Sequence, residues 1–217
     1  MLKKTRDYYA ADRSEMLRFV PLDAKRVLEV GCGEGRFGAA LKAINPREVW
    51  GVELSPGAAE CASKVLDRVI PGDFSAIVET LPEAFFDCVI FNDVLEHLID
   101  PFQILQQVKR ILTTNGDVAL SLPNVRYIKN VFNFLVKKDW CYQDHGILDY
   151  THFHFFTKKS ILRMFEGEGY NVSLILGINP TCFPFFGVFN FLTFGLFGDT
   201  KHMQYACVAH PRSNNRL

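Results

Sequence analysis

The chain lacks cysteine pairs of the kind that bind zinc. Its six cysteines stand at positions 32, 61, 88, 141, 182 and 207, and no two of them form a CxxC pair. Zinc ribbons need such pairs, whereas a thiol inside an apolar segment behaves as a small hydrophobe. We therefore expect reduced cysteines in a cytoplasmic protein, and we assign no metal-binding residues.

An excess of charge of either sign is also missing. Lysine and arginine together number 24, aspartate and glutamate together number 24, and the formal net charge is zero. A balanced chain creates no overall field that gathers phosphate groups. This argues against nucleic acid as a partner.

Long uninterrupted apolar runs are absent as well. Residues 1–7 lead into no apolar segment, so we see no secretory signal. The most apolar stretch, 181–198, is interrupted by proline, glycine, asparagine and threonine. A transmembrane helix needs about 20 mostly apolar residues, so we expect no membrane span.

What the chain does contain is an alternation of strand and helix patterns. Strand patterns stand at 26–30, 49–53, 68–70, 86–91 and 118–122, and helical patterns follow residue 35, Ser55 and Asp100. This alternation predicts an α/β fold with a mostly parallel sheet and helices on both faces. Later strands at 171–176 and 204–209 have no crossover helix between them, which predicts an antiparallel pair.

We interpret the 217 residues as one domain with three parts. These are a core at 22–122, a cap on the substrate side at 123–160 and a Phe-rich insert at 179–200. Within the cap, apolar spacing predicts an amphipathic helix over 125–138, and 139–156 is aromatic and histidine-rich without a clear period. A polar helix is expected over 8–20, ahead of the first strand.

The first predicted strand runs directly into a glycine-rich turn, Gly31-Cys32-Gly33-Glu34-Gly35. Glycines let the backbone turn sharply and let a ligand approach the amides that begin the next helix. A dinucleotide fingerprint would need a third glycine where Arg36 stands, which disfavours an NAD-dependent oxidoreductase.

Acids at the ends of the next two strands indicate the shape of the ligand. Glu53 is placed to accept both hydroxyls of a ribose, and Asp73 to accept from an exocyclic amine. Phe74 can lie against a flat base. An amino-acid end, a ribose and an adenine fit this series better than a pyrophosphate does.

These segments resemble the class I S-adenosylmethionine-dependent methyltransferases. The matching segments are VLEVGCGEG at 27–35, GVELS at 51–55, GDF at 72–74, FDCVIFNDVLEHL at 86–98, and 112–123. The resemblance implies a Rossmann-like, doubly wound sheet of seven strands in the order 3-2-1-4-5-7-6. It also implies S-adenosylmethionine as cofactor and S-adenosylhomocysteine as product.

The same resemblance implies a set of cofactor contacts. We expect them at Tyr8, Arg13, Glu29, Gly31, Cys32, Gly33, Glu53, Leu54, Asp73, Phe74, Asn92 and Asp93. A leading helix would lie over the cofactor, where Arg13 either pairs with the methionine carboxylate or is a solvated helix residue.

A narrower resemblance covers the cap. LPNV at 122–125, GILDYTH at 146–152 and FFT at 155–157 resemble bacterial methyltransferases tied to cell-surface polysaccharide synthesis. Those enzymes are distantly similar to the ubiquinone-pathway O-methyltransferases. An arginine usually precedes FFT in that group, but His154 stands here, which weakens any inference of an anionic acceptor.

Histidines are the main candidates for chemistry. A hydroxyl nucleophile needs a proton acceptor, and imidazole has a suitable pKa of about 6.5. We predict catalytic roles for His97, His152, His154 and Asp93, and His145 belongs to the same irregular segment as two of them. His97 with Glu96 could instead only brace its loop, and Asp93 with His152 and His154 could hold a metal.

Methylation of the oxygen of a small-molecule, glycan or lipid-linked acceptor is therefore the leading hypothesis. The alternative is a module that binds the cofactor without turnover. The Phe-rich insert leaves two readings open. It is either a helix packed on the core or on a dimer partner, or an apolar lid or membrane-surface patch that receives a hydrophobic acceptor.

Overall fold

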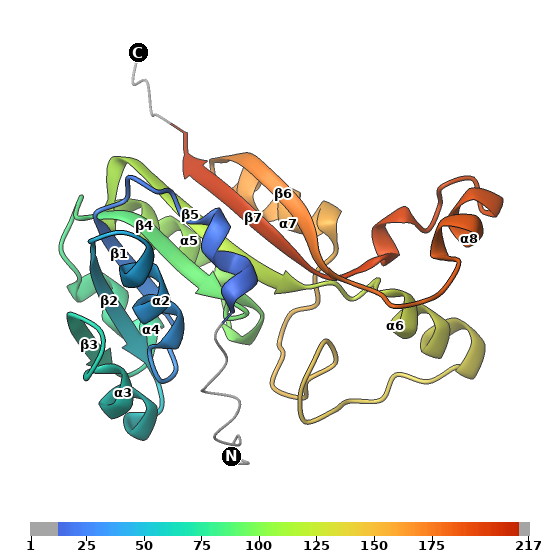
Figure 1. Cartoon of the computed structure of the whole chain (residues 1–217), viewed down its shortest axis with the longest axis horizontal. Coiled ribbons are helices and arrows are strands. Elements are labelled where there is room, and N and C mark those ends of the chain that lie inside the picture. Colours follow the sequence, from blue (N-terminus) through green and yellow to red (C-terminus); the bar gives the residue numbers. More distant parts are fainter. Residues whose placement is uncertain (1–12, 213–217) are drawn as a thin grey trace.

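The computed structural model describes residues 13–212 and contains one sheet of seven strands (Figure 1). Their order is β3-β2-β1-β4-β5-β7-β6. The strands are β1 (Arg26–Val30), β2 (Glu48–Glu53), β3 (Arg68–Pro71), β4 (Phe86–Asn92), β5 (Leu112–Pro123), β6 (Tyr170–Pro180) and β7 (His202–Pro211). The first five are parallel, and β7 is antiparallel to both β5 and β6. The predicted order and the pairing of the last two strands are confirmed.

Helices cover both faces of this sheet (Figure 1). One face carries the 3₁₀ helix η1 (Ser14–Phe19), α2 (Arg36–Ile44) and the end of α3 (Pro56–Ala62). The other face carries α4 (Phe74–Ile77), η2 (Val78–Thr80), α5 (Pro101–Ile111) and α7 (Lys158–Gly167). The result is the three-layer arrangement that the alternation predicts.

The central strands supply side chains to two separate cores. In β4, Val89 and Phe91 join the core under α5, while Cys88 and Ile90 join the core under α2. Successive side chains of a strand point to opposite faces, and all four are fully buried. This explains why the central strands are continuously apolar rather than alternating.

The helix predicted over 125–138 is present but begins later and is irregular. The structure has α6 (Ile128–Phe132) followed by a π-helical turn, η4 (Asn133–Lys137). Ile128 at its start packs against the buried cluster of Tyr127, Ile147 and Leu148, but Phe132 and Leu135 further along are more than half exposed. The apolar face that the spacing predicts is therefore covered at its start and exposed at its end. Of the helix expected over 8–20, only the part from residue 13 onward is described.

The Phe-rich insert forms a second projecting segment beside α6. It contains α8 (Phe186–Leu192) and ends in the 3₁₀ turn η5 (Gly198–Thr200). Arg126, just before α6, donates two hydrogen bonds to Asp199 at 2.6 and 3.1 Å and so joins the bases of the two segments. Both segments stand beyond the carboxyl ends of β4 and β5 (Figure 1), the edge at which ligands bind in this fold class.

Candidate functional site

The glycine turn after β1 has the geometry that its sequence predicts. Gly31, Gly33 and Gly35 have φ angles of 69°, 53° and 81°, a left-handed region that glycine adopts without steric cost. The Gly31 N–H donates to the Val52 carbonyl at 2.8 Å, which fixes the turn against β2. A Cβ at Gly51 would come within 2.5 Å of the Cys32 Sγ. The turn therefore lies directly on the second strand.

Glu53 lies at the end of β2 and faces this turn. Its carboxylate accepts the Gly33 N–H and the Ser55 N–H, each at 2.8 Å, and the residue is 6% exposed. Each oxygen keeps a second lone pair for a ligand hydroxyl. Leu54, the next residue, is exposed.

Asp73 and Phe74 follow β3 and lie differently from each other. Asp73 is exposed and accepts the Ser75 N–H at 2.8 Å, which makes it the N-cap of α4. The Phe74 ring is buried and packs edge-on against Phe91, with the ring centroids 5.7 Å apart. We expected this ring to lie against a base. The structure places it in the core instead, because the first turn of α4 directs it at the sheet.

Two further residues that we expect to contact the cofactor, Glu29 and Cys32, have side chains buried beneath the glycine turn. Glu29 is 3% exposed and lies under Gly38 of α2. Burial raises the pKa of Glu29 to about 8, and the neighbouring charge of Glu53 acts in the same direction. The Cys32 side chain is also buried, and burial raises the pKa of its thiol. The structure thus places both side chains where they support the turn from beneath.

Asp93 and Arg13 form an ion pair. Asp93 has a left-handed φ of 53°, and its carboxylate pairs with Arg13 and accepts hydrogen bonds from Ser121 and Gln204. Arg13 was expected to meet the cofactor carboxylate or the solvent, but its described partners are Asp93 and Glu15. Both residues therefore brace the turn that follows β4.

Asn92, the last residue of β4, is buried at its tip. Neither its amide nitrogen nor its amide oxygen has a hydrogen-bond partner among residues 13–212. Buried polar groups in native proteins are nearly always bonded. A polar ligand at the end of β4 would supply the missing partners.

A cluster of imidazoles and a carboxylate follows that turn. His97, in the 3₁₀ helix η3 (Leu95–His97), and His152 pack edge-to-face with ring centroids 4.6 Å apart. The His152 Nε2 lies 3.9 Å from the Glu96 Oε1. Burial raises the pKa of Glu96 well above its usual range, and the charge of Asp93 adds to this.

The 139–156 segment supplies the groups that orient these rings. His152 donates from Nδ1 to the Ile147 carbonyl at 3.0 Å. The Thr151 hydroxyl donates to Asp149 at 2.7 Å, and its oxygen lies 3.1 Å from the His97 Nδ1. Asp149 is buried. Residues 147–151 therefore hold the rings of His97 and His152 in defined orientations.

The structure does not bring the other predicted histidine into this cluster. The His154 Nε2 lies 3.1 Å from the Ile99 carbonyl. The metal set of Asp93, His152 and His154 is therefore not assembled, since Asp93 is bonded elsewhere. Tyr8 lies outside the described residues.

Sequence reasoning gave no functional role to Glu96, Asp149 or Thr151. For Glu96 the sequence suggests only a role in bracing its loop, and Asp149 and Thr151 are two residues of the GILDYTH motif. A clearer signal would have been an acid inside the apolar run VLEHL.

Comparison with known families decides the assignment of this fold. The methyltransferase-domain family matches residues 1–174. The chain belongs to the methyltransferase-domain family. The expected family and the expected class of enzyme are thereby confirmed at the level of the family.

Several relatives of this methyltransferase domain are S-adenosylmethionine-dependent by name. A probable S-adenosylmethionine-dependent methyltransferase of Mycobacterium tuberculosis is 35% identical over 101 residues, which is 46% of this chain and 36% of that protein. The 27-O-demethylrifamycin SV methyltransferase of Amycolatopsis mediterranei is 32% identical over 46% of this chain and 40% of its own. A ubiquinone biosynthesis O-methyltransferase of Pseudomonas putida is 32% identical over 48% and 47%. The chain thus spans less than half the length of these relatives.

Solved structures share the fold of the methyltransferase domain. An S-adenosylmethionine-dependent methyltransferase of Archaeoglobus fulgidus has a TM-score of 0.66 at 18% identity, covering 94% of each chain. A Burkholderia thailandensis N1-methyltransferase, solved with bound S-adenosylhomocysteine, has a TM-score of 0.61 at 15% identity, covering 94% of this chain and 80% of that one. The glycine turn, the Glu53 carboxylate and the unsatisfied Asn92 amide fit such a cofactor.

Proposed function

We propose that this methyltransferase domain transfers the methyl group of S-adenosylmethionine to a hydroxyl oxygen. The acceptor oxygen attacks the methyl carbon, the carbon–sulfur bond breaks, and its electron pair stays on sulfur. The hydroxyl proton passes to one of the two clustered imidazoles or to water as the new C–O bond forms. The products are a methyl ether and S-adenosylhomocysteine. The protein must align oxygen, carbon and sulfur and must help to remove the proton.

The observation that carries this proposal is the cluster of Glu96, His97 and His152 beside the glycine turn. A Cβ at Gly31 would come within 2.8 Å of the Val94 side chain, so the turn leading into η3 lies against the glycine turn. In this proposal His97 and His152 stand close to the end of the cofactor that carries the methyl group, which the contact between the two turns supports. Their held orientations suit activation of a hydroxyl.

The cofactor contacts follow the same geometry. We assign the ribose hydroxyls to Glu53, the adenine amine to Asp73 and the amino-acid end to the glycine turn and Asn92. The core at 22–122 then binds the cofactor, the cap at 123–160 covers the acceptor and the insert at 179–200 extends the acceptor side. A cytoplasmic location belongs to this proposal and is supported by the free state of all six cysteines.

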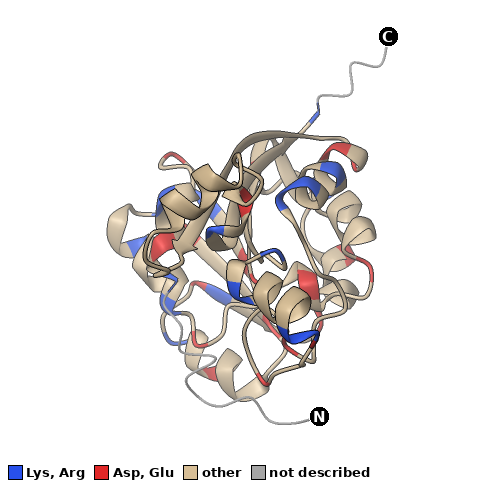
Figure 2. Cartoon of the chain, turned by 90° about the vertical axis from the view of Figure 1, so that its right-hand side faces the viewer, with Lys and Arg blue, Asp and Glu red and all other residues tan. Residues whose placement is uncertain are grey.

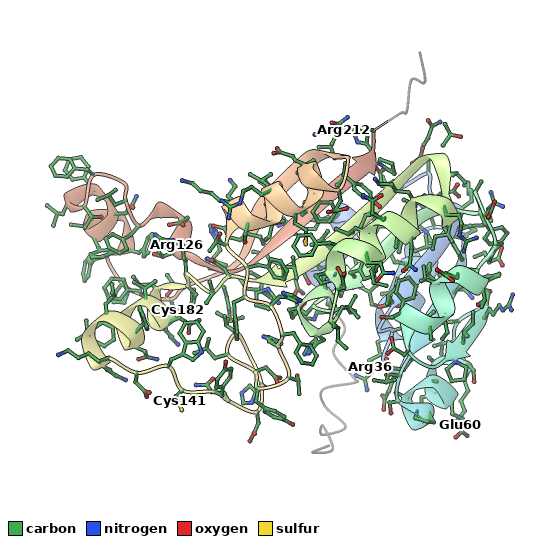
Figure 3. All side chains as sticks on the ribbon, turned by 180° about the vertical axis from the view of Figure 1, so that it is seen from behind. Arg36, Glu60, Arg126, Cys141, Cys182 and Arg212 are labelled. Carbon is green, nitrogen blue, oxygen red and sulfur yellow. The ribbon has the colours of Figure 1, made fainter. Side chains whose placement is uncertain are left out.

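The acceptor in this proposal is apolar or carried on a lipid. Exposed apolar side chains gather on the two projecting segments, at Phe132, Phe134, Leu135, Val136, Phe183, Phe185, Val188, Phe191, Leu192, Phe194 and Leu196. Aromatic side chains stand out from the α8 segment in Figure 3. Exposed apolar patches of this kind mark interaction sites.

Basic residues flank this apolar surface. Lys129, Lys137, Lys138 and Lys201 are exposed beside it, although Figure 2, which faces this end of the molecule, shows both signs of charge interspersed over the chain. Apolar side chains next to lysines suit the surface of an anionic bilayer. Among residues 13–212, no helix has the length and hydropathy needed to span a membrane. We propose that the two segments rest on a membrane surface.

Methyl transfer to a panel of acceptors tests the function. Labelled S-adenosylmethionine is offered with phenols, sugar alcohols, polyprenyl-linked glycosides and matched amines, after thermal shifts have shown stabilisation by S-adenosylmethionine but not by NAD. We expect methyl ethers, and we expect His97→Ala and His152→Ala to lower transfer at least about 100-fold while cofactor affinity stays within a factor of two or so. His154→Ala is the matched control. Transfer to the amines alone, or full activity in both variants, would contradict the proposal.

A further inference from the structure

Glu96, His97 and His152 offer the geometry of a cation site. Each contributes one ligand atom, and these atoms lie within 4.8 Å of one another. Two ligands of one ion at about 2.0–2.2 Å each can be at most about 4.4 Å apart. The three side chains are therefore close to ligand spacing, and the 3.9 Å between Glu96 and His152 is too long for a hydrogen bond.

The Glu96 carboxylate is an independent indication of a missing positive partner. It is 1% exposed, and neither oxygen has a hydrogen-bond partner among the described residues. Burying a carboxylate is costly unless it is paired or coordinates a metal. The Arg13 guanidinium, whose charge also acts on Glu96, is paired with Asp93 and Glu15. A cation held between Glu96 and the two imidazoles would satisfy these oxygens.

The surroundings of the imidazoles match those of metal-binding histidines. Such histidines usually donate from one ring nitrogen to a carbonyl or carboxylate, and this fixes the other nitrogen toward the ion. His152 donates to the Ile147 carbonyl, and the His97 Nδ1 lies 3.1 Å from the Thr151 hydroxyl oxygen, which is bonded to Asp149. In both rings Nδ1 is thus engaged by the 139–156 segment.

We propose that Glu96, His97 and His152 bind one first-row divalent cation, with Zn²⁺ as the reference ion. Two imidazoles and one carboxylate suit zinc or iron better than magnesium or calcium, which prefer oxygen ligands throughout. The inference rests on the proposed function for its role. A hydroxyl coordinated to the ion loses its proton to water more easily, so the imidazoles would activate the acceptor as ligands of the ion.

Zinc binding to the chain alone tests this site without any acceptor. Calorimetry with Zn²⁺ is performed on a Cys141→Ser/Cys182→Ser background, because these two exposed thiols, labelled in Figure 3, could bind zinc by themselves. We expect one ion per chain, and at least tenfold weaker binding in Glu96→Gln and in His152→Asn. His154→Asn, two positions from the cluster residue, should bind as the background does.

Cooperative thermal unfolding shows whether each variant is folded. If either Glu96→Gln or His152→Asn does not fold, the other variant alone tests the site. With Co²⁺ in place of Zn²⁺, visible absorption bands should appear in the background protein and be lost in the folded cluster variants. Absence of binding in the background, or equal binding in the cluster variants, overturns the site. Methyl transfer is measured separately, so failure of zinc binding would leave the proposed O-methylation standing.

Discussion

The carboxylates of Glu53 and Asp73 differ in the hydrogen bonds that they accept within the protein. Glu53 accepts hydrogen bonds from the backbone amides of Gly33 and Ser55, whereas Asp73 caps a four-residue helix. Charged hydrogen bonds are each worth about 1.5–3 kcal/mol, and about 1.4 kcal/mol is a factor of ten in affinity. We predict that Glu53→Ala weakens S-adenosylmethionine binding at least about tenfold in calorimetry, and that Asp73→Ala weakens it less.

A second substitution separates loss of the ribose contact from loss of the turn. Glu53→Gln keeps an acceptor oxygen for one backbone amide but removes the charge, so it should lie between the wild type and Glu53→Ala. Arg36→Ala, on an exposed side chain beyond the same turn, serves as the control and should bind normally. An unchanged affinity in Glu53→Ala would falsify the assignment of the ribose to this residue.

At the residue scale the sequence predicted positions better than roles. The positive φ angles of Gly31, Gly33 and Gly35 follow from a glycine turn between strand and helix. The burial of Phe74 does not, because a phenylalanine at the start of a helix can face either the ligand or the sheet. The partners of Arg13 and Asp93 also depend on β7, through Gln204, which is remote in sequence.

The Phe-rich insert has its own small core, which divides its phenylalanines into two groups. Phe189 packs against Phe183, Phe186 and Phe197, with ring centroids 5.2–6.3 Å apart. Phe191 and Phe194 are 80% and 95% exposed. A substitution at Phe189 therefore tests the fold of the insert, and substitutions at the other two test its surface.

We predict that Phe191→Ser/Phe194→Ser abolishes binding to vesicles that contain anionic lipid and leaves the free energy of unfolding and the cofactor affinity unchanged. Stability and cofactor affinity should not change because these two rings contact solvent and not the core, and vesicle binding should be lost because they are among the most exposed rings of the insert. Phe189→Ser opens the packed cluster and should lower the free energy of unfolding by about 1–3 kcal/mol, less than the roughly 3–5 kcal/mol of a core phenylalanine because this ring is half-buried. Vesicle sedimentation, chemical denaturation and calorimetry measure the three quantities.

Leu22→Ser is the matched control, because Leu22 is 70% exposed on another part of the chain. It should leave vesicle binding intact. Equal sedimentation of the wild type and the double variant would disprove the membrane contact. A wild-type dimer in solution that the double variant converts to monomers would instead assign this surface to a second copy of the chain.

At the scale of elements, the apolar spacing over 125–138 shows the limit of periodicity. A helical pattern predicts that one face is buried, but not that its partner belongs to the same chain. In this fold α6 and α8 both project past the sheet, and Arg126 with Asp199 ties them at their bases. A partner outside the chain would explain why Phe132 and Leu135 of the α6 segment and Phe191 of α8 remain exposed.

For the whole molecule, the sheet was predictable and the cluster of Glu96, His97 and His152 was not. Alternating strand and helix patterns restrict the topology, and the family resemblance supplied the strand order. The cluster joins the turn after β4 to a segment without a period, and no local pattern specifies where such a segment lies. Contacts between side chains of irregular segments can therefore be identified only from the three-dimensional structure.

Glu29 couples the stability of the whole molecule to pH. Its carboxyl has a pKa of about 8 in the fold, raised first by burial and then by the charge of Glu53, against 4.5 for an ordinary glutamate. Between these values the unfolded chain releases the proton and the folded chain keeps it. The free energy of unfolding therefore falls as pH rises through this window, by up to about 1.4 kcal/mol per pH unit from this group.

We predict that Glu29→Gln removes this contribution, since the amide has a similar shape and does not ionise. Below pH 4.5 the carboxyl is protonated in both states, so Glu29 adds no slope there. Urea unfolding at pH 5, 6.5 and 8 should show the variant gaining stability relative to wild type as pH rises. The exposed Glu60, labelled in Figure 3, gives the control Glu60→Gln. Other carboxylates affect wild type and variant alike, so the difference between the two isolates Glu29. A difference that stays constant across the three pH values would show that Glu29 is already ionised in the folded chain.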